Sequence, residues 1–344
     1  MNSPSPATPA LNAILGQPLD VGDPDVSGPL AVFPLFGPPA ELDYAPFAAV
    51  HEQVTITELE GGASVNDLTV HNRYSKPVLL FEGEELLGAQ QNRVLDISLL
   101  IAAGTKTVIP VSCVEQGRWD GRRHGERFQP SRQAADPDLR RKKKETARKR
   151  VAAGLDARAD QGAVWAAVSV REAELGASSP TGAMHDIYES RRDQLSELRG
   201  PIGLHDGQCG AVVAIAGRIA ILDFVGRDDV WSQLHPALVE GYALDALRAG
   251  QATVAPDPPE LQTVRGFTLL TTDAPAENRT AGPGLGETIR FAASGVAGSA
   301  LIAEEELVQI TAYLDSEDGR TPEQTPPTGR RASIPRPSRR RGRR

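Results

Sequence analysis

Two short polar runs, at residues 81–93 and 113–119, interrupt a part of the sequence that is otherwise apolar and strand-like. Burying an unpaired carboxylate costs several kcal/mol, so such a dense set of charges needs cations, amides or a ligand as partners. The carboxylates that could act as a general acid or base are Glu82, Glu84 and Glu115. The side chains that could bind a ligand are Gln91, Asn92, Arg93, Arg118 and Trp119.

This set of side chains suits an anion that carries a planar ring. Guanidinium groups bind carboxylates and phosphates through paired hydrogen bonds, and an indole beside a guanidinium offers a flat surface on which a purine can stack. If residues 81–86 are extended, Glu82 and Glu84 project from one face about 7 Å apart and Glu85 projects from the other. The alternative is a structural network of ion pairs, because such networks also gather charge without a ligand.

The cysteines and histidines give no signal for a metal site or for thiol catalysis. Cys113 and Cys209 form no CxxC or Cys/His spacing, and the six histidines show no HxH or HxxxH spacing. A buried, inert thiol is the expected state of Cys113. We therefore assign no metal and no cofactor.

Composition favours a protein with a proper core and many turns. The chain has 344 residues, of which 40% are apolar and only 5% aromatic, with 33 glycines and 27 prolines. The sequence has no recognisable secretion signal and no apolar run near the roughly 20 residues that a membrane-spanning helix needs. These features predict a cytoplasmic protein without a membrane segment.

Short apolar or β-branched segments separated by Gly, Pro and Asn predict strands in the first part of the chain. They are residues 30–35, 54–59, 68–72, 78–82, 94–101 and 107–114. Pro110 falls inside the last of them and must therefore sit at an edge or a bulge. The spacing of these strands is typical of a β-sandwich or barrel.

A helical insertion is expected at about residues 132–200, starting at Asp136-Pro137, which is a good N-terminal signal. Strands then resume as a hairpin at residues 211–224, followed by a helix that restarts at Pro236. Four further strands are expected at residues 267–271, 288–293, 296–303 and 308–314. The predicted fold is α+β, with a sandwich-like or barrel-like antiparallel core interrupted by helices.

The expected organisation is a flexible leader at residues 1–28, one domain at residues 29–314 and a disordered, Arg-rich tail at residues 315–344. Two basic segments are residues 140–150, bounded by Arg140 and Arg150, and residues 330–344, bounded by Arg330 and Arg344. A solvated helix face is the usual meaning of the first segment. Both segments could also contact a nucleic acid or an acidic partner.

Several motifs carry a family resemblance: EGEEL at residues 82–86, GAQQNR at 88–93, PVSCVEQGRW at 110–119, QGAVW at 161–165, and residues 207–224. Together they resemble the ADP-ribosylglycohydrolase- and rhodanese-phosphatase-associated protein domain, over residues 30–314. This resemblance implies a prokaryotic protein found in the genomic company of ADP-ribose enzymes, and it implies no particular reaction. It makes ADP-ribose or a related nucleotide metabolite the first ligand to consider.

Three functions therefore remain open at the level of sequence. The leading one is a protein that binds a nucleotide-like, ADP-ribose-related small molecule. The second is a hydrolase of such a metabolite, in which one of Glu82, Glu84 or Glu115 is the general base. The third is an adaptor that binds nucleic acid or an acidic partner through its basic segments.

Overall fold

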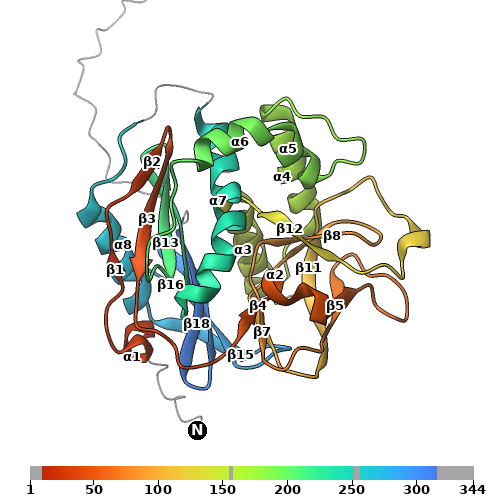
Figure 1. Cartoon of the computed structure of the whole chain (residues 1–344), viewed down its shortest axis with the longest axis horizontal. Coiled ribbons are helices and arrows are strands. Elements are labelled where there is room, and N and C mark those ends of the chain that lie inside the picture. The colour runs from red at the N-terminus through yellow and green to blue at the C-terminus, as the bar shows by residue number, and fades with distance from the viewer. Residues whose placement is uncertain (1–9, 155–157, 251–255, 316–344) are drawn as a thin grey trace, which may run out of the picture.

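The structure, a computed structural model, describes residues 10–154, 158–250 and 256–315. Eighteen strands and eight α-helices lie within these ranges, and their arrangement confirms the predicted α+β class with a strand-rich core (Figure 1). The basic segment at residues 330–344, and all of the expected tail except Asp315, lie outside the described residues.

A nine-stranded antiparallel sheet combines strands from both ends of the domain. In spatial order its strands are β1 (Asp20–Val21), β3 (Leu30–Phe36), β13 (Gly210–Ile215), β14 (Arg218–Val225), β18 (Glu306–Leu314), β17 (Val296–Ala303), β16 (Glu287–Ala293) and β15 (Ala276–Ala281), with β2 (Asp25–Ser27) also paired to β3. The predicted hairpin is confirmed as β13–β14. Its two-residue loop, Ala216-Gly217, has positive φ at both positions, the geometry of the tight turns that match strand twist.

The remaining strands form two smaller sheets. One contains β12 (Gln129–Ala134), β8 (Glu84–Leu87), β9 (Arg93–Leu95), β11 (Lys106–Cys113), β6 (Asp67–Asn72) and β5 (Val54–Thr57), and the other contains β10 (Leu99–Ile101), β7 (Val78–Leu80) and β4 (Ala45–Pro46). The single strand expected at residues 94–101 is thus two strands in two sheets. Pro110 is the last β11 residue paired with β6, after which β11 pairs with β9, so the proline sits at a change of partner.

Helices separate and cover the sheets. They are α1 (Leu11–Leu15), α2 (Phe47–Val50), α3 (Pro137–Ala152), α4 (Gln161–Glu174), α5 (Met184–Ser190), α6 (Arg192–Arg199), α7 (Asp228–Gly250) and α8 (Leu261–Asp273). Single 3-10 turns occur at His51–Gln53 and Gly121–Arg123. As predicted, α3 begins at Asp136-Pro137, where the Asp136 carboxylate accepts a hydrogen bond of 3.0 Å from the backbone N–H of Leu139.

The long helix α7 runs between the nine-stranded sheet and the smaller sheets (Figure 1). Its buried side chains, Trp231, Leu238 and Tyr242 among them, join strands of both halves in one apolar core. The helix continues through Pro236, although the sequence suggested a new start there. Proline removes one backbone donor from a helix interior, and burial of α7 on several sides offsets that loss.

The expectation of a strand at residues 267–271 is wrong, because these residues belong to α8 on the outer face of the nine-stranded sheet (Figure 1). Val264, Phe267, Thr268 and Thr271 are buried, and their spacing is helical. The missing fourth strand is β15, whose polar sequence gave no strand signal. Residues 11–27, which were expected to belong to a flexible leader, include α1, β1 and β2.

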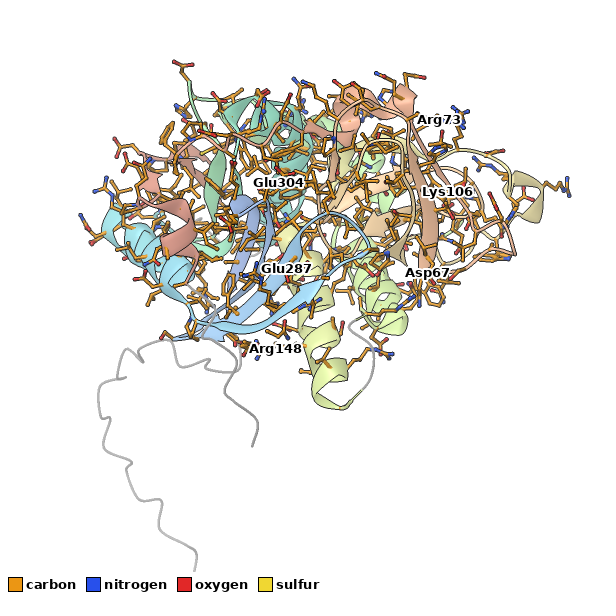
Figure 2. All side chains as sticks on the ribbon, turned by 90° about the horizontal axis from the view of Figure 1, so that it is seen from below. Asp67, Arg73, Lys106, Arg148, Glu287 and Glu304 are labelled. Carbon is orange, nitrogen blue, oxygen red and sulfur yellow. The ribbon has the colours of Figure 1, made fainter. Side chains whose placement is uncertain are left out.

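Different charged residues lie near the six-stranded sheet and near the nine-stranded sheet. Asp67, Arg73 and Lys106 lie around the six-stranded sheet, whereas Arg148 on α3 lies close to the strands that carry Glu287 (Figure 2). The basic helix α3 therefore faces the nine-stranded sheet. None of the helices in the described part of the chain is both long and apolar enough to cross a lipid bilayer.

Candidate functional site

The two predicted polar runs meet around the carboxylate of Glu115, directly after β11. One carboxylate oxygen accepts hydrogen bonds from Arg118 Nε at 2.7 Å and from the Thr181 hydroxyl at 2.8 Å. The other accepts from Arg118 Nη2 at 2.7 Å and from the backbone N–H of Asn92 at 3.0 Å. Burial alone would raise the pKa of Glu115, but these hydrogen bonds outweigh it and hold the pKa below its ordinary value. Both oxygens of the Glu115 carboxylate therefore have hydrogen-bond partners within the cluster.

Arg93 is completely buried beneath Trp119 and continues this cluster. Its Nη1 donates to the Gln91 carbonyl at 2.9 Å, its Nη2 lies 3.7 Å from the Glu58 carboxylate, and its guanidinium carbon lies 5.9 Å from the centroid of the Trp119 ring. Burial lowers the pKa of Arg93. The outer side of Trp119 is open, since the residue is 49% exposed. Sequence reasoning expected a Trp–Arg pair but named Arg118 as the partner.

Cys113 lies in the same buried cluster. Its thiol is free and donates to the side-chain carbonyl of Gln91 at 3.1 Å. Burial raises the pKa of Cys113, which keeps the thiol neutral. This environment agrees with the inert thiol expected from the sequence.

The glutamates of the first run lie apart, because Phe81 to Glu84 form a turn and not the extended strand assumed from the sequence. Gly83 has φ 90°, and the backbone N–H of Glu84 donates to the Phe81 carbonyl at 3.1 Å. The Glu84 carboxylate accepts from the backbone N–H of Phe81 at 2.6 Å, and burial raises the pKa of Glu84 to about 8. Glu85 instead accepts from the Gln133 amide at 2.7 Å. Glu84 and Glu85 are therefore isolated from the Glu115 cluster.

Glu82 belongs to a third environment, where α3 meets β18. One carboxylate oxygen lies 2.5 Å from the Lys144 ammonium. The other accepts from the Tyr313 hydroxyl at 3.2 Å and lies 3.5 Å from Arg140 Nη2. Glu82 is almost completely buried, so these partners are what make its charge tolerable there.

Arg140 connects Glu82 to a second buried carboxylate, Asp223. Two guanidinium nitrogens of Arg140 contact the two Asp223 oxygens at 2.7 Å each, and Asp223 also accepts from the hydroxyls of Tyr242 at 2.6 Å and Thr311 at 2.9 Å. Sequence reasoning missed this network, although an aspartate inside an apolar strand was a usable signal. The interpretation of the basic run as a solvated face is wrong for Arg140, which is buried.

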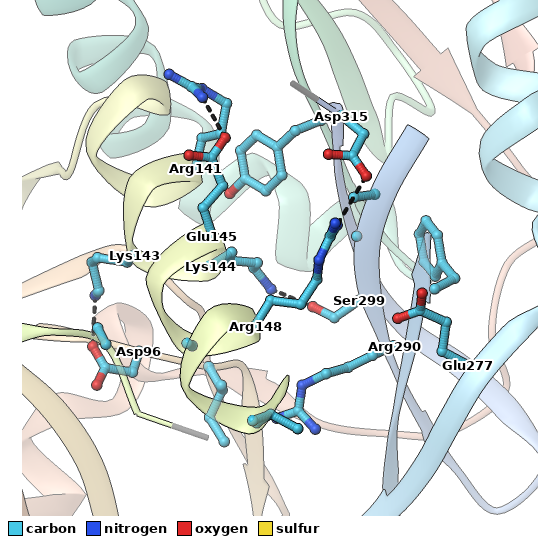
Figure 3. A pocket seen from close by; sticks show the side chains of 18 of the residues that line it. Asp96, Arg141, Lys143, Lys144, Glu145, Arg148, Glu277, Arg290, Ser299 and Asp315 are labelled. Atoms are coloured by element: carbon cyan, nitrogen blue, oxygen red, sulfur yellow. Dashed lines mark hydrogen bonds and ion pairs between the residues drawn. The ribbon is translucent and has the colours of Figure 1, made fainter. Parts of the chain in front are cut away.

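A cavity of about 350 Å³ lies between α3 and strands β16 to β18 (Figure 3). Its cationic lining residues are Arg141, Lys143, Lys144, Arg148 and Arg290. The cavity is also lined by four carboxylates, Asp96, Glu145, Glu277 and Asp315, and by apolar side chains, Phe291 and Leu314 among them. None of the predicted site residues lines this cavity in the described part of the chain, although Glu82 contacts Lys144 at its wall.

Of the five described cations of the cavity, four are already in ion pairs: Lys144 with Glu82, Arg141 with Asp138 and Glu145, and Lys143 and Arg148 as follows. Lys143 Nζ lies 2.8 Å from an Asp96 oxygen, and Arg148 Nη1 donates to Asp315 at 2.9 Å (Figure 3). These pairs bridge α3 to the loop after β9 and to the end of β18. They fix the position of the helix over the strands.

Arg290 is different, because its guanidinium has no carboxylate within 4.0 Å among the residues that the structure describes. Within the described part of the chain its side chain makes one hydrogen bond, a long one of 3.5 Å from Nη1 to the Thr280 hydroxyl. Burial lowers the pKa of Arg290, and the attraction of the more distant Glu82 carboxylate does not fully offset that effect. A half-buried cation in this state is a ready partner for an anion.

The described residues contain no group of three or more His, Cys, Asp or Glu side chains arranged to hold a metal ion. Comparison with curated proteins and with solved structures found no match. A sequence model of one family does match, over residues 18–313, which is most of the chain. The chain therefore belongs to the ARG and Rhodanese-Phosphatase-superfamily-associated Protein domain family.

Proposed function

We propose that the chain binds an anionic small molecule of nucleotide size in the cavity between α3 and β16 to β18. The observation that carries this proposal is the state of Arg290, a half-buried guanidinium at the cavity wall without an ion pair in the described structure. A phosphate or carboxylate on the ligand would provide the missing partner. Hydrogen bonds between ions of this kind are among the strongest that proteins make.

The size and lining of the cavity support an organic ligand over a bare inorganic ion. Small-molecule pockets occupy about 300–1,000 Å³ and are mostly apolar, with a few polar groups that orient the ligand. The cavity, at about 350 Å³, is at the small end of this range and combines Phe291, Ile97 and Leu314 with charged groups. A planar body on the apolar wall and an anionic group at Arg290 would satisfy both parts of the lining.

ADP-ribose and simpler adenine nucleotides are the compounds to test first. The sequence resemblance points to ADP-ribose metabolism, and the family's name associates it with ARG and rhodanese-phosphatase proteins. Neither of these associations identifies a ligand. The cavity adds a chemical reason, since these compounds combine phosphate groups with a planar base.

A ligand role for Gln91, Asn92, Arg93, Arg118 and Trp119 stays a prediction. The polar groups of Glu115 and Arg118 are occupied by one another, so a ligand would have to displace existing hydrogen bonds. The exposed ring of Trp119 is the part of this set that remains accessible. The hydrolase alternative has less support, because Glu84 and Glu115 lie outside the cavity lining and Glu82 is held by Lys144 and Arg140.

Calorimetric titration of the full chain with ADP-ribose, AMP and inorganic phosphate tests the proposal. We expect AMP or ADP-ribose to bind, and Arg290→Ala to weaken that binding roughly 10- to 100-fold, the effect of losing one charge-assisted hydrogen bond. Arg279→Ala is the matched control. Arg279 lies on neighbouring β15 and pairs with Glu287, outside the cavity lining.

Equal loss of affinity in both arginine variants would contradict the assignment of the cavity. Binding that persists in Arg290→Ala but is lost in Trp119→Ala would show that the ligand binds at the Glu115 cluster and not in the cavity. No binding of any of the three compounds would refute the proposal for nucleotide-like ligands.

A further inference from the structure

We propose that Lys144 is a reactive amine that captures a carbonyl group of the cavity's ligand as an imine. This inference rests on the proposed function and narrows it, because the ligand would then be an anion that also carries an aldehyde or ketone. Open-chain sugar phosphates and ADP-ribose, whose terminal ribose can open to an aldehyde, belong to this chemical class.

Lys144 is placed at the boundary between the cavity and the buried network. Its Nζ lies 2.5 Å from the Glu82 carboxylate and contacts the Ser299 hydroxyl, which also lines the cavity (Figure 3). The side chain is 21% exposed, so a ligand in the cavity can reach it. Burial lowers the pKa of Lys144; the Glu82 carboxylate opposes this shift without cancelling it, and the charges of Arg290 and Arg140 act in the same direction as burial. An amine with a larger neutral fraction is the usual nucleophile of imine-forming proteins.

Glu82 is positioned to move the protons that imine formation requires. It first takes a proton from the Lys144 ammonium, and the neutral amine then attacks the carbonyl carbon, forming the C–N bond. Glu82 protonates the carbonyl oxygen, accepts a second proton from nitrogen, and returns it to the hydroxyl, which leaves as water. The product is a protonated imine beside a Glu82 carboxylate. Atoms and charges balance, and the ion pair is restored.

The surroundings of Glu82 suit it to this exchange. Tyr313 donates to one carboxylate oxygen at 3.2 Å, and Arg140 lies 3.5 Å from the same oxygen. These two groups stabilise the carboxylate whether or not Lys144 carries a proton. The other oxygen remains directed at Lys144. Glu82 is thus held in place by groups that are not consumed in the reaction.

Arg290 provides the second point of attachment. It lines the same cavity from β16, whereas Lys144 reaches the cavity from α3 (Figure 3). A ligand whose anionic group pairs with Arg290 would be held with the rest of its length in the cavity. Holding two reactants in one site raises the effective concentration of the carbonyl at the amine.

The neighbouring lysines provide internal controls. Lys143 is 4% exposed and is held by Asp96 at 2.8 Å and by the Leu95 carbonyl at 3.0 Å. Lys142 is 41% exposed and pairs with Asp138 at 2.9 Å. Neither has the combination of cavity access and a buried carboxylate that Lys144 has. The whole sequence contains only six lysines, so the labelling of each can be followed separately.

The experiment labels the full chain with pyridoxal 5′-phosphate, an aromatic aldehyde that carries a phosphate. Cyanoborohydride reduces any imine to a stable secondary amine, and peptide mass spectrometry locates the label. We expect Lys144 to be labelled at least about tenfold faster than Lys142 near pH 7, because its neutral amine is more populated. We also expect AMP, which has no carbonyl group, to protect Lys144 and not Lys142.

Lys144→Arg keeps the charge beside Glu82 but cannot form an imine. It should lose the fast labelling, and calorimetry with AMP reports in parallel whether the cavity still binds a phosphate. Fast labelling that persists in Lys144→Arg would overturn the inference. Slow labelling of Lys144 in a protein whose AMP binding depends on Arg290 would also overturn the inference. That outcome would not contradict the proposed function. If Lys144→Arg does not fold, site-resolved labelling of the unchanged chain with and without AMP decides the matter.

Discussion

The Glu115 cluster and the cavity beside α3 both contain several charged side chains, but the two regions differ in how fully those charges are paired. In the cluster, both Glu115 oxygens accept hydrogen bonds and Arg118 is fully engaged. In the cavity, Arg290 has no carboxylate partner among the described residues. A dense run of charges in a sequence can therefore reflect structural pairing, whereas a charge left without a partner indicates a ligand.

The sharpest test of this contrast is to break a fully buried pair, Arg140 with Asp223. Arg140→Met leaves Asp223 as a buried carboxylate without a cation and leaves Glu82 with Lys144, and we expect it to lower the free energy of unfolding by about 3–5 kcal/mol. Chemical denaturation at neutral pH measures the change. Arg141→Met is the control, because Arg141 is 30% exposed in its ion pairs and should contribute less than about 1 kcal/mol. Similar small losses in both variants would show that the network is not structural.

A second test addresses the cluster itself. Glu115→Gln preserves the shape of the side chain but removes the charge that Arg118 requires, so we expect a loss of about 2 kcal/mol at pH 7. The pKa of Glu115 is held below its ordinary value, so its contribution is present above the unfolded pKa and disappears as pH falls through the folded pKa. Denaturation at pH 7 and at pH 3 should show the difference between variant and parent shrinking in acid.

Ligand affinity of the cavity should stay unchanged in Glu115→Gln. A loss of ligand affinity in Glu115→Gln would instead show that the Glu115 cluster is part of the ligand site. The two regions would then no longer differ in function.

Glu84 offers a test of the opposite sign. Burial raises its pKa to about 8, so the folded state holds a proton that the unfolded state releases near its ordinary carboxyl pKa. Its contribution to stability therefore declines as pH rises from about 4.5 towards 8. Relative to the parent, Glu84→Gln, which mimics the protonated form, should gain roughly 3–4 kcal/mol of stability at pH 8 and less than about 1 kcal/mol at pH 5. Denaturation at both pH values checks this, and a destabilised variant at pH 8 would contradict it.

Local signals in the sequence predicted much of the fold. The Asp136-Pro137 start of α3 and the β13–β14 hairpin both depend on short-range chemistry, namely a cap and a tight turn. The prediction of a strand at residues 267–271 was wrong. The β-branched threonines of this segment favour a strand, but its buried residues recur at helical spacing and it forms part of α8.

The cavity could not be found in this way. Its walls come from α3 and from strands more than a hundred residues later, and no local pattern links Lys144 to Ser299 or Arg290. The turn at Gly83 also separated Glu82 from Glu84, which the assumption of an extended strand had placed on one face. Long-range packing decides both features.

The strand order of the nine-stranded sheet has a consequence for how the protein is made. β14 forms a hairpin with β13 but pairs on its other side with β18, and the facing residues Asp223 and Thr311 are 88 residues apart in the chain. While the nascent chain emerges from the ribosome, the outer edge of β14 stays unpaired until β18 has been synthesised. Such an open edge invites pairing with other chains, and distant contacts slow folding. Completion of this sheet should therefore follow translation, and a chain stalled before residue 306 should depend on chaperones to remain unaggregated.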